Sequence, residues 1–67
     1  MFQIDVKLEN RTEHIPFYSK WAAVEMCKKI GRCVDVKEAA VIDLTTGEIY
    51  IIYQEQQLTW AAGYGEF

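Results

Sequence analysis

Apolar and polar residues alternate strictly near the start of the chain. The apolar positions are Phe2, Ile4, Val6 and Leu8. Polar or charged residues occupy every position between them. A period of two residues is typical of a β-strand with one buried face and one face in water. We therefore predict a half-buried strand over residues 2–9, followed by a polar loop over residues 10–16 that ends at Pro16.

A helical period follows over residues 17–30. The apolar positions that share one face of this helix are Ala23, Val24, Cys27 and Ile30. Pro16 suits the first position of the helix, and Ser19 is an alternative N-cap. Gly31 suits the residue just after the helix, where a left-handed conformation is common. We predict one amphipathic helix that covers one face of a sheet.

Two further strands are predicted over residues 33–44 and 48–54, joined by a tight turn. Asp43 can accept hydrogen bonds from the N–H groups of the turn, and Gly47 can adopt the left-handed conformation that closes it. If Asp43 pairs with Glu48, the partners that follow are Ile42 with Ile49, Val41 with Tyr50, Ala40 with Ile51, and Ala39 with Ile52. One face of the hairpin then carries Ile42, Ala40, Ile49, Ile51 and Tyr53, and the other carries Val41, Ala39, Tyr50 and Ile52.

Both faces of this hairpin are apolar, although a single helix can cover only one of them. We expect the second face to be covered by the C-terminal tail, by another copy of the chain, or by a foreign partner. The tail over residues 55–67 is rich in aromatic residues and contains a possible short fourth strand at Leu58–Ala61. Two interpretations of Trp60 stay open: it folds back onto the hairpin, or it anchors a partner.

The predicted fold is therefore two-layer α+β, in β-α-β-β order. An antiparallel sheet of three or four strands carries one helix on one face. A chain of 67 residues, of which 51% are apolar and 25% charged, has the length and composition of one globular domain, residues 1–67. No apolar run approaches the length of a membrane span, and the first residues do not resemble a signal peptide, so we expect a cytoplasmic protein.

Charge is distributed unevenly along the chain. Residues 1–37 contain seven basic and five acidic residues, a net charge of +2, whereas residues 38–67 contain five acidic residues and no base, a net charge of −5. An acidic half argues against binding to a nucleic-acid backbone there. The basic residues around the helix leave a second possibility, a homo-oligomeric domain that binds nucleic acid or a small ligand through the basic helix edge.

The residues that catalysis or metal binding require are scarce. His14 and Ser19 are the only residues of their types, and no carboxylate is spaced to complete a triad with them. A metal site built from His14, Cys27 and Cys33 is one ligand short of a structural zinc site. We read both cysteines as reduced, buried and inert, and leave open whether they pair. We predict no catalytic residue, no metal and no cofactor.

The element order, the small size and the hairpin loop Asp43-Leu44-Thr45-Thr46-Gly47-Glu48 resemble the short accessory proteins encoded by tailed bacteriophages. This resemblance implies a non-enzymatic inhibitor or modulator of a larger host protein complex, such as a nuclease, a defence system or a polymerase. Acidic charge beside aromatic residues favours a partner with a basic surface, and the two apolar hairpin faces favour a homodimer. The predicted partner-binding residues are Val41, Tyr50, Ile52, Trp60, Tyr64 and Phe67.

Overall fold

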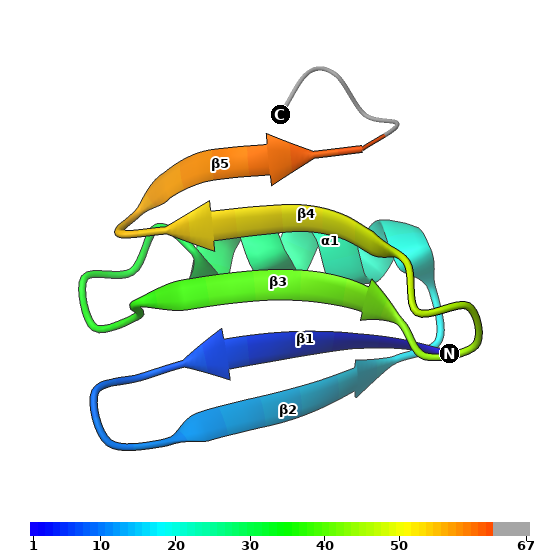
Figure 1. Ribbon diagram of the computed structural model, residues 1–67, viewed down its shortest axis with the longest axis horizontal. Helices are drawn as coiled ribbons and strands as arrows, with labels where there is room; N and C mark the ends of the chain where they lie inside the picture. The colour runs from blue at the N-terminus through cyan, green and yellow to red at the C-terminus, as the bar shows by residue number, and fades with distance from the viewer. Residues whose placement is uncertain (63–67) are drawn as a thin grey trace.

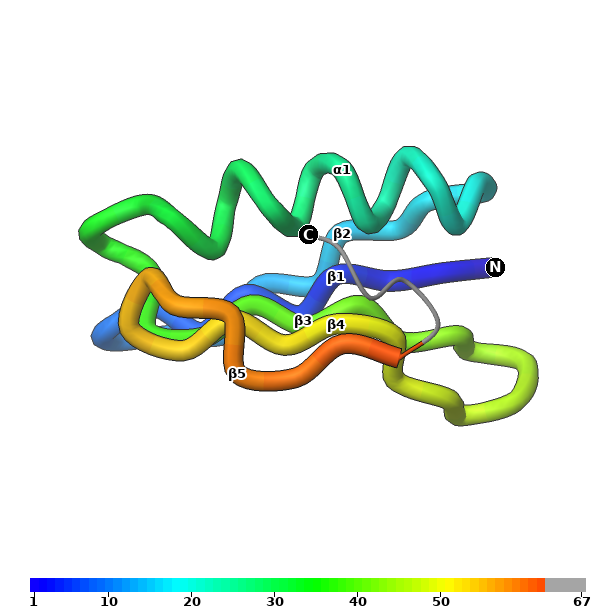
Figure 2. The backbone as a smooth tube through the Cα atoms, turned by 90° about the horizontal axis from the view of Figure 1, so that it is seen from above, coloured from blue at the N-terminus to red at the C-terminus, as the bar shows by residue number. Residues whose placement is uncertain are grey.

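The computed structural model describes residues 1–62, which form one five-stranded antiparallel sheet and one helix (Figure 1). The elements are β1 (Phe2–Lys7), β2 (Thr12–Phe17), α1 (Lys20–Ile30), β3 (Glu38–Asp43), β4 (Ile49–Gln54) and β5 (Gln57–Ala61). The strands lie in the order β2-β1-β3-β4-β5. Figure 2 shows α1 lying along one side of the sheet, which makes the fold two-layered.

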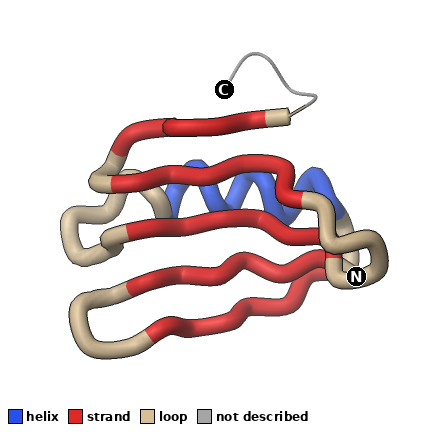
Figure 3. Tube along the Cα trace, in the orientation of Figure 1, coloured by secondary structure: helices blue, strands red, loops and turns tan. Residues whose placement is uncertain are grey.

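The predicted class, an antiparallel sheet with one helix, is confirmed, but the number and order of the strands differ from the prediction. The segment expected to be a loop over residues 10–16 contains β2, and the tail supplies β5, so the sheet has five strands (Figure 3). Pro16 lies within β2 rather than at the start of the helix. Because β2 is an edge strand, one side of its backbone has no partner and a proline without an N–H is tolerated there.

The helix begins where a side chain can cap it. Ser19 is the N-cap, as the alternative prediction had it, and its Oγ accepts a hydrogen bond from the Ala22 N–H at 3.3 Å. Lys28 and Lys29 occupy the last turn, where positive charge interacts favourably with the helix dipole. Gly31 caps the end in a right-handed conformation (φ −65°), so the expectation of a left-handed glycine is wrong. A close approach explains the glycine instead, because an added Cβ would lie 2.5 Å from Cβ and Cγ of Tyr53.

The hydrophobic core fills the single layer between α1 and the sheet. Its largest fully buried side chains are those of Ile4, Val24, Cys27, Val41 and Ile51. They come from the helix and from the three central strands β1, β3 and β4, so the core lies on only one side of the sheet.

The turn between β3 and β4 has the predicted chemistry. Asp43 Oδ1 accepts the Thr45 N–H at 2.8 Å, the Asp43 carbonyl accepts the Gly47 N–H at 2.7 Å, and Gly47 is left-handed with φ +80°. The Asp43 N–H donates to the Glu48 carbonyl at 2.8 Å, which confirms the predicted start of the hairpin register. The β4–β5 connection is tighter and has no glycine: Glu55 and Gln56 both have positive φ.

Candidate interaction surface

The sheet has one face covered by α1 and one face that no described element covers. Ile4, Val41 and Ile51 lie side by side on three neighbouring strands and have no exposed surface, so they define the covered face. Successive side chains in a strand point to opposite faces. The residues at alternate positions therefore form the opposite face, which we call the open face.

A β-bulge changes which hairpin residues reach the open face. The pairing of Ile42 with Ile49 is as predicted, but Val41 pairs with Ile51 and Ala40 with Ile52, so Tyr50 is an extra residue in β4. The predicted pairs beyond Ile42 are therefore wrong by one residue. A bulge places two residues of one strand opposite one residue of its neighbour and interrupts the alternation of side chains.

The bulge places Tyr50 on the covered face. The Tyr50 ring lies 6.1 Å from the ring of Phe2 between centroids, and Lys20 Nζ at the start of α1 lies 4.6 Å from the Tyr50 centroid. The pKa of Tyr50 is raised first by desolvation and then by the carboxylates of Glu48 and Asp43. The Tyr50 hydroxyl donates to Glu48 Oε1 at 3.3 Å. Tyr50 is thus half-buried and already has partners within the chain.

The open face carries an apolar patch over β3, β4 and β5. We call its members the apolar patch: Ala40, Ile42, Ile49, Ile52 and Trp60. Ile42 pairs with Ile49, and Ile52 pairs with Ala40 on one side and with Trp60 on the other, so the patch is continuous. Trp60 is 45% exposed and Ile49 is 38% exposed. Ile42 and Ile52 are half-buried, and Ala40 is buried at 6% exposed. Exposed apolar side chains that lie beside one another are typical of interaction sites.

The other half of the open face, over β1 and β2, is polar. Asp5 pairs with His14 across the two strands, and Asp5 Oδ1 lies 2.7 Å from His14 Nδ1. Gln3 Nε2 donates to the same oxygen at 2.7 Å. At the far end of β1, Lys7 Nζ lies 3.8 Å from Glu38 Oε1. These polar side chains interact with one another. The apolar patch is therefore the part of the open face that offers apolar contact area to a partner.

Acidic residues predominate in the part of the chain that carries the patch. The described residues 38–62 contain Glu38, Asp43, Glu48 and Glu55 and no basic residue. A hydrogen bond from the Thr45 N–H lowers the pKa of Asp43 from its ordinary value of 3.8. Two basic side chains from elsewhere in the chain approach this region: Lys7 Nζ lies 3.8 Å from Glu38 Oε1, and Lys20 Nζ lies over the Tyr50 ring.

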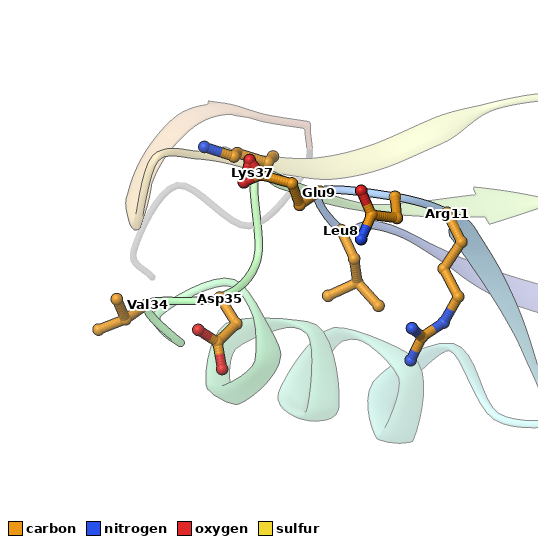
Figure 4. A pocket seen from close by; sticks show the side chains of 7 residues that line it. Leu8, Glu9, Arg11, Val34, Asp35 and Lys37 are labelled. Carbon is orange, nitrogen blue, oxygen red and sulfur yellow. The ribbon is translucent and has the colours of Figure 1, made fainter.

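Two shallow hollows lie at opposite ends of the molecule. The first, of about 390 Å³, lies between the β1–β2 connection and the loop after α1, and charged side chains such as Glu9, Arg11 and Asp35 line it (Figure 4). In Figure 4, Leu8 and Arg11 extend toward the helix side and Val34 points away. The second hollow, of about 490 Å³, lies at the end of β5 and is more apolar.

The described residues do not assemble a catalytic or metal-binding cluster. No group of three metal-ligating side chains occurs in residues 1–62. Cys27 lies in the core, where burial raises its pKa to about 12, so its thiol is a poor nucleophile at neutral pH. Cys33 is exposed rather than buried, and its Sγ donates to the Lys29 carbonyl at 3.5 Å. Both cysteines are free thiols, which agrees with the prediction that they are reduced.

The predicted partner-binding residues fall into three groups. Ile52 and Trp60 lie next to each other on the open face. Tyr50 and Val41 lie on the covered face, and Val41 has no exposed surface with which to meet a partner. Tyr64 and Phe67 lie outside the described residues. Three members of the patch, Ala40, Ile42 and Ile49, were absent from the predicted set, although the hairpin pattern had placed them together on one apolar face.

In the described part of the chain, the 11 residues of α1 are too few and too polar to cross a membrane. Comparison with known proteins gives no match: no family model fits the chain, and no curated protein or solved structure is similar to it.

Proposed function

We propose that the protein is a non-enzymatic protein-binding module that contacts its partner through the apolar patch. The observation that carries the proposal is that these five side chains lie on a sheet face that no described element covers. A sheet face in water is normally polar, because an exposed apolar surface costs free energy and promotes aggregation. An apolar surface of this kind is expected where a partner removes it from water.

The partner that fits is a protein surface with an apolar centre and a basic border. The excess of acidic residues in the part of the chain that carries the patch disfavours nucleic acid and attracts basic groups, and such complementarity raises the rate of encounter. Trp60 supplies a large, amphipathic side chain of the type that dominates binding free energy at interfaces. A large host complex that holds nucleic acid, such as a nuclease, a defence system or a polymerase, offers this chemistry, and binding to it makes the protein an inhibitor or modulator.

Substitution on the two sides of the molecule tests the location of the interface. Ile52→Ala and Trp60→Ala are expected to weaken partner binding by about 2 kcal/mol or more each. Trp21→Ala is the matched control, because Trp21 is 60% exposed on the helix. Reversal of Lys28 and Lys29 to Glu is expected to change binding by less than about 0.5 kcal/mol. The measurement is quantitative affinity capture from lysate, with circular dichroism and urea unfolding to verify the fold of every variant. Loss of capture in the helix variants alone would place the interface on α1 and contradict the proposal.

Salt dependence separates three uses of the surface. Between about 50 mM and about 500 mM salt, a basic protein partner should bind only modestly less tightly, because apolar contacts provide most of the binding free energy. Binding of nucleic acid through the basic helix edge should weaken steeply over the same range. Self-association through the patch should strengthen, because two copies bring the same excess of acidic residues together and salt screens that repulsion. Capture that falls steeply with salt would contradict the proposed partner.

A further inference from the structure

The two edges of the sheet differ in how they are protected from pairing with another strand. The outer strand β2 contains Pro16, which has no N–H, and Glu13, whose carboxylate lies 2.6 Å from Nε of Arg11. Proline and charge are the usual devices by which natural edge strands avoid pairing. The opposite outer strand, β5, has the sequence Gln-Leu-Thr-Trp-Ala and contains neither.

Among the described residues, β5 has little cover on either face, and only its last residue, Ala61, packs against the core. The helix packs against β1, β2, β3 and β4, whereas β5 contacts only β4 among the described elements. Every side chain of β5 except that of Ala61 is exposed. A strand held by one neighbour and with little cover is marginally stable, so a further strand on its outer edge would stabilise it.

One protective device is present, and it limits where a new strand can pair. Between Ile52 and Tyr53 the β4–β5 register shifts, so Thr59 is an extra residue, and its hydroxyl donates to the Ile52 carbonyl at 3.2 Å. Such a bulge disrupts the ladder locally. Pairing resumes at Trp60 and continues to the Ala62 N–H, which donates to the Tyr50 carbonyl at 2.9 Å. In the regular stretch over residues 60–62 the backbone groups of Trp60 and Ala62 face β4, so the N–H and C=O on the outer edge are those of Ala61.

A side-chain pocket lies beside that part of the edge. The second hollow is lined by Lys20, Glu48, Ile49, Tyr50, Trp60 and Ala62. Its apolar walls come from the start of β4 and the end of β5, and its charged groups are one ammonium and one carboxylate. Strand-addition sites combine an unpaired edge, which provides main-chain hydrogen bonds, with pockets for alternate side chains, which provide specificity.

We propose that the outer edge of β5 at residues 60–62 accepts an extended strand from the protein partner and that an apolar side chain of this strand enters the second hollow. This inference rests on the proposed function, because it specifies how that partner binds. Of the two charged groups at the hollow, Lys20 Nζ lies over the Tyr50 ring, and the Glu48 carboxylate favours a strand with lysine or arginine at the adjoining end. A second copy of the chain fits less well, because its β5 carries no lysine or arginine to meet Glu48.

Backbone-methylated peptides test the proposal. The probe is a set of terminally blocked peptides of about seven residues with lysine at both ends, alternating valine and threonine, and a central apolar residue that varies across the set. In an extended strand, alternate N–H groups point to opposite edges. Methylating the N–H groups on one edge should weaken binding at least about tenfold, and methylating the other edge should leave it unchanged. The two methylated peptides have the same side chains and serve as controls for each other.

Two further measurements are made on the protein rather than on the peptide. Trp60→Ala should weaken peptide binding at least about tenfold, whereas Trp21→Ala should not change it. Peptide binding should also slow amide hydrogen exchange in β5 more than in β2, because a new neighbour protects an edge strand. Peptides with glutamate in place of the terminal lysines should bind more weakly.

Three results would overturn the proposal: equal affinity for both methylated peptides, no saturable binding by any peptide of the set, or binding that appears only when residues 63–67 are removed. None of these decides the proposed function, which is tested separately and fails if capture of the protein partner is insensitive to Ile52→Ala and Trp60→Ala. Capture that depends on Ile52 and Trp60, together with peptides indifferent to methylation, would mean that the partner docks on the open face without adding a strand.

Discussion

The contact between Gly31 and Tyr53 makes Gly31→Ala the most informative test of the packing. An alanine Cβ at this position would lie 2.5 Å from Cβ and Cγ of Tyr53 and 2.9 Å from Cδ2. The Tyr53 Cβ is fixed to the backbone of the central strand β4, and the ring is 3% exposed, so the side chain cannot rotate out of the way. The strain must move the end of α1 away from the sheet.

The expected cost is dominated by this overlap. Forcing extra atoms into a packed core costs about 1–3 kcal/mol. A gain in helix propensity offsets it by less than about 1 kcal/mol, because Gly31 lies at the cap and not inside the helix. We expect a net loss of about 2 kcal/mol in the free energy of unfolding, which for a domain of this size lowers the Tm by about 8–16 °C.

A second glycine provides the control. Gly47 has nothing within 4 Å of an added Cβ but has φ +80°, so Gly47→Ala costs only the left-handed conformation, about 1 kcal/mol. Urea unfolding followed by circular dichroism gives the midpoint and slope for both variants. If Gly31→Ala unfolds at the same urea concentration as the unsubstituted protein, or at a higher one, α1 does not approach β4 as closely as the structure has it.

Three further predictions concern the thiols, the hairpin turn and the bulge. In the native protein a thiol reagent should modify Cys33 rapidly and Cys27 only as the protein unfolds, because burial raises the Cys27 pKa to about 12; two rapid thiols would contradict this. Asp43→Ala should reduce the loss of stability on acidification, because the Asp43 pKa is lowered in the folded state. The contribution of Asp43 is complete above its ordinary pKa of 3.8 and is lost as the pH falls through the lower folded-state pKa, which urea midpoints across acidic pH would measure. Ile51→Ala should cost about 2–5 kcal/mol because Ile51 is fully buried, whereas Ile52→Ala should cost about 1 kcal/mol or less; equal costs would mean that the bulge is misplaced.

The parts of the fold that could be predicted are those that local sequence determines. The alternation in β1, the Ser19 cap and the Asp43–Gly47 turn each depend on residues a few positions apart, and each gave a correct element. β2 was missed because Pro16 and the polar residues before it are typical of a loop. Only its place at the sheet edge makes a strand of this composition acceptable.

The candidate surface could be predicted only in part, because it depends on one inserted residue. The sequence indicates that the β3–β4 hairpin has two apolar faces, and it places Tyr50 correctly on the face of Val41. It does not indicate the bulge, so Ile51 and Ile52 were each predicted on the wrong face. A shift of one residue moves a side chain to the other face of a sheet, so a bulge in β4 exchanges the predicted members of the two faces.

Small size links the fold to the proposed function. A sheet of five strands has two faces, and the described residues 1–62 provide one helix, which covers only one of them. The chain makes the β1–β2 half of the open face compatible with water through Gln3, Asp5 and His14. Over β3–β5 the open face stays apolar, although a charged residue in place of Ile42 or Ile52 would make it more compatible with water. An apolar surface that a single substitution could make polar, on a strand edge without charge or proline, is better explained by a partner than by the needs of folding.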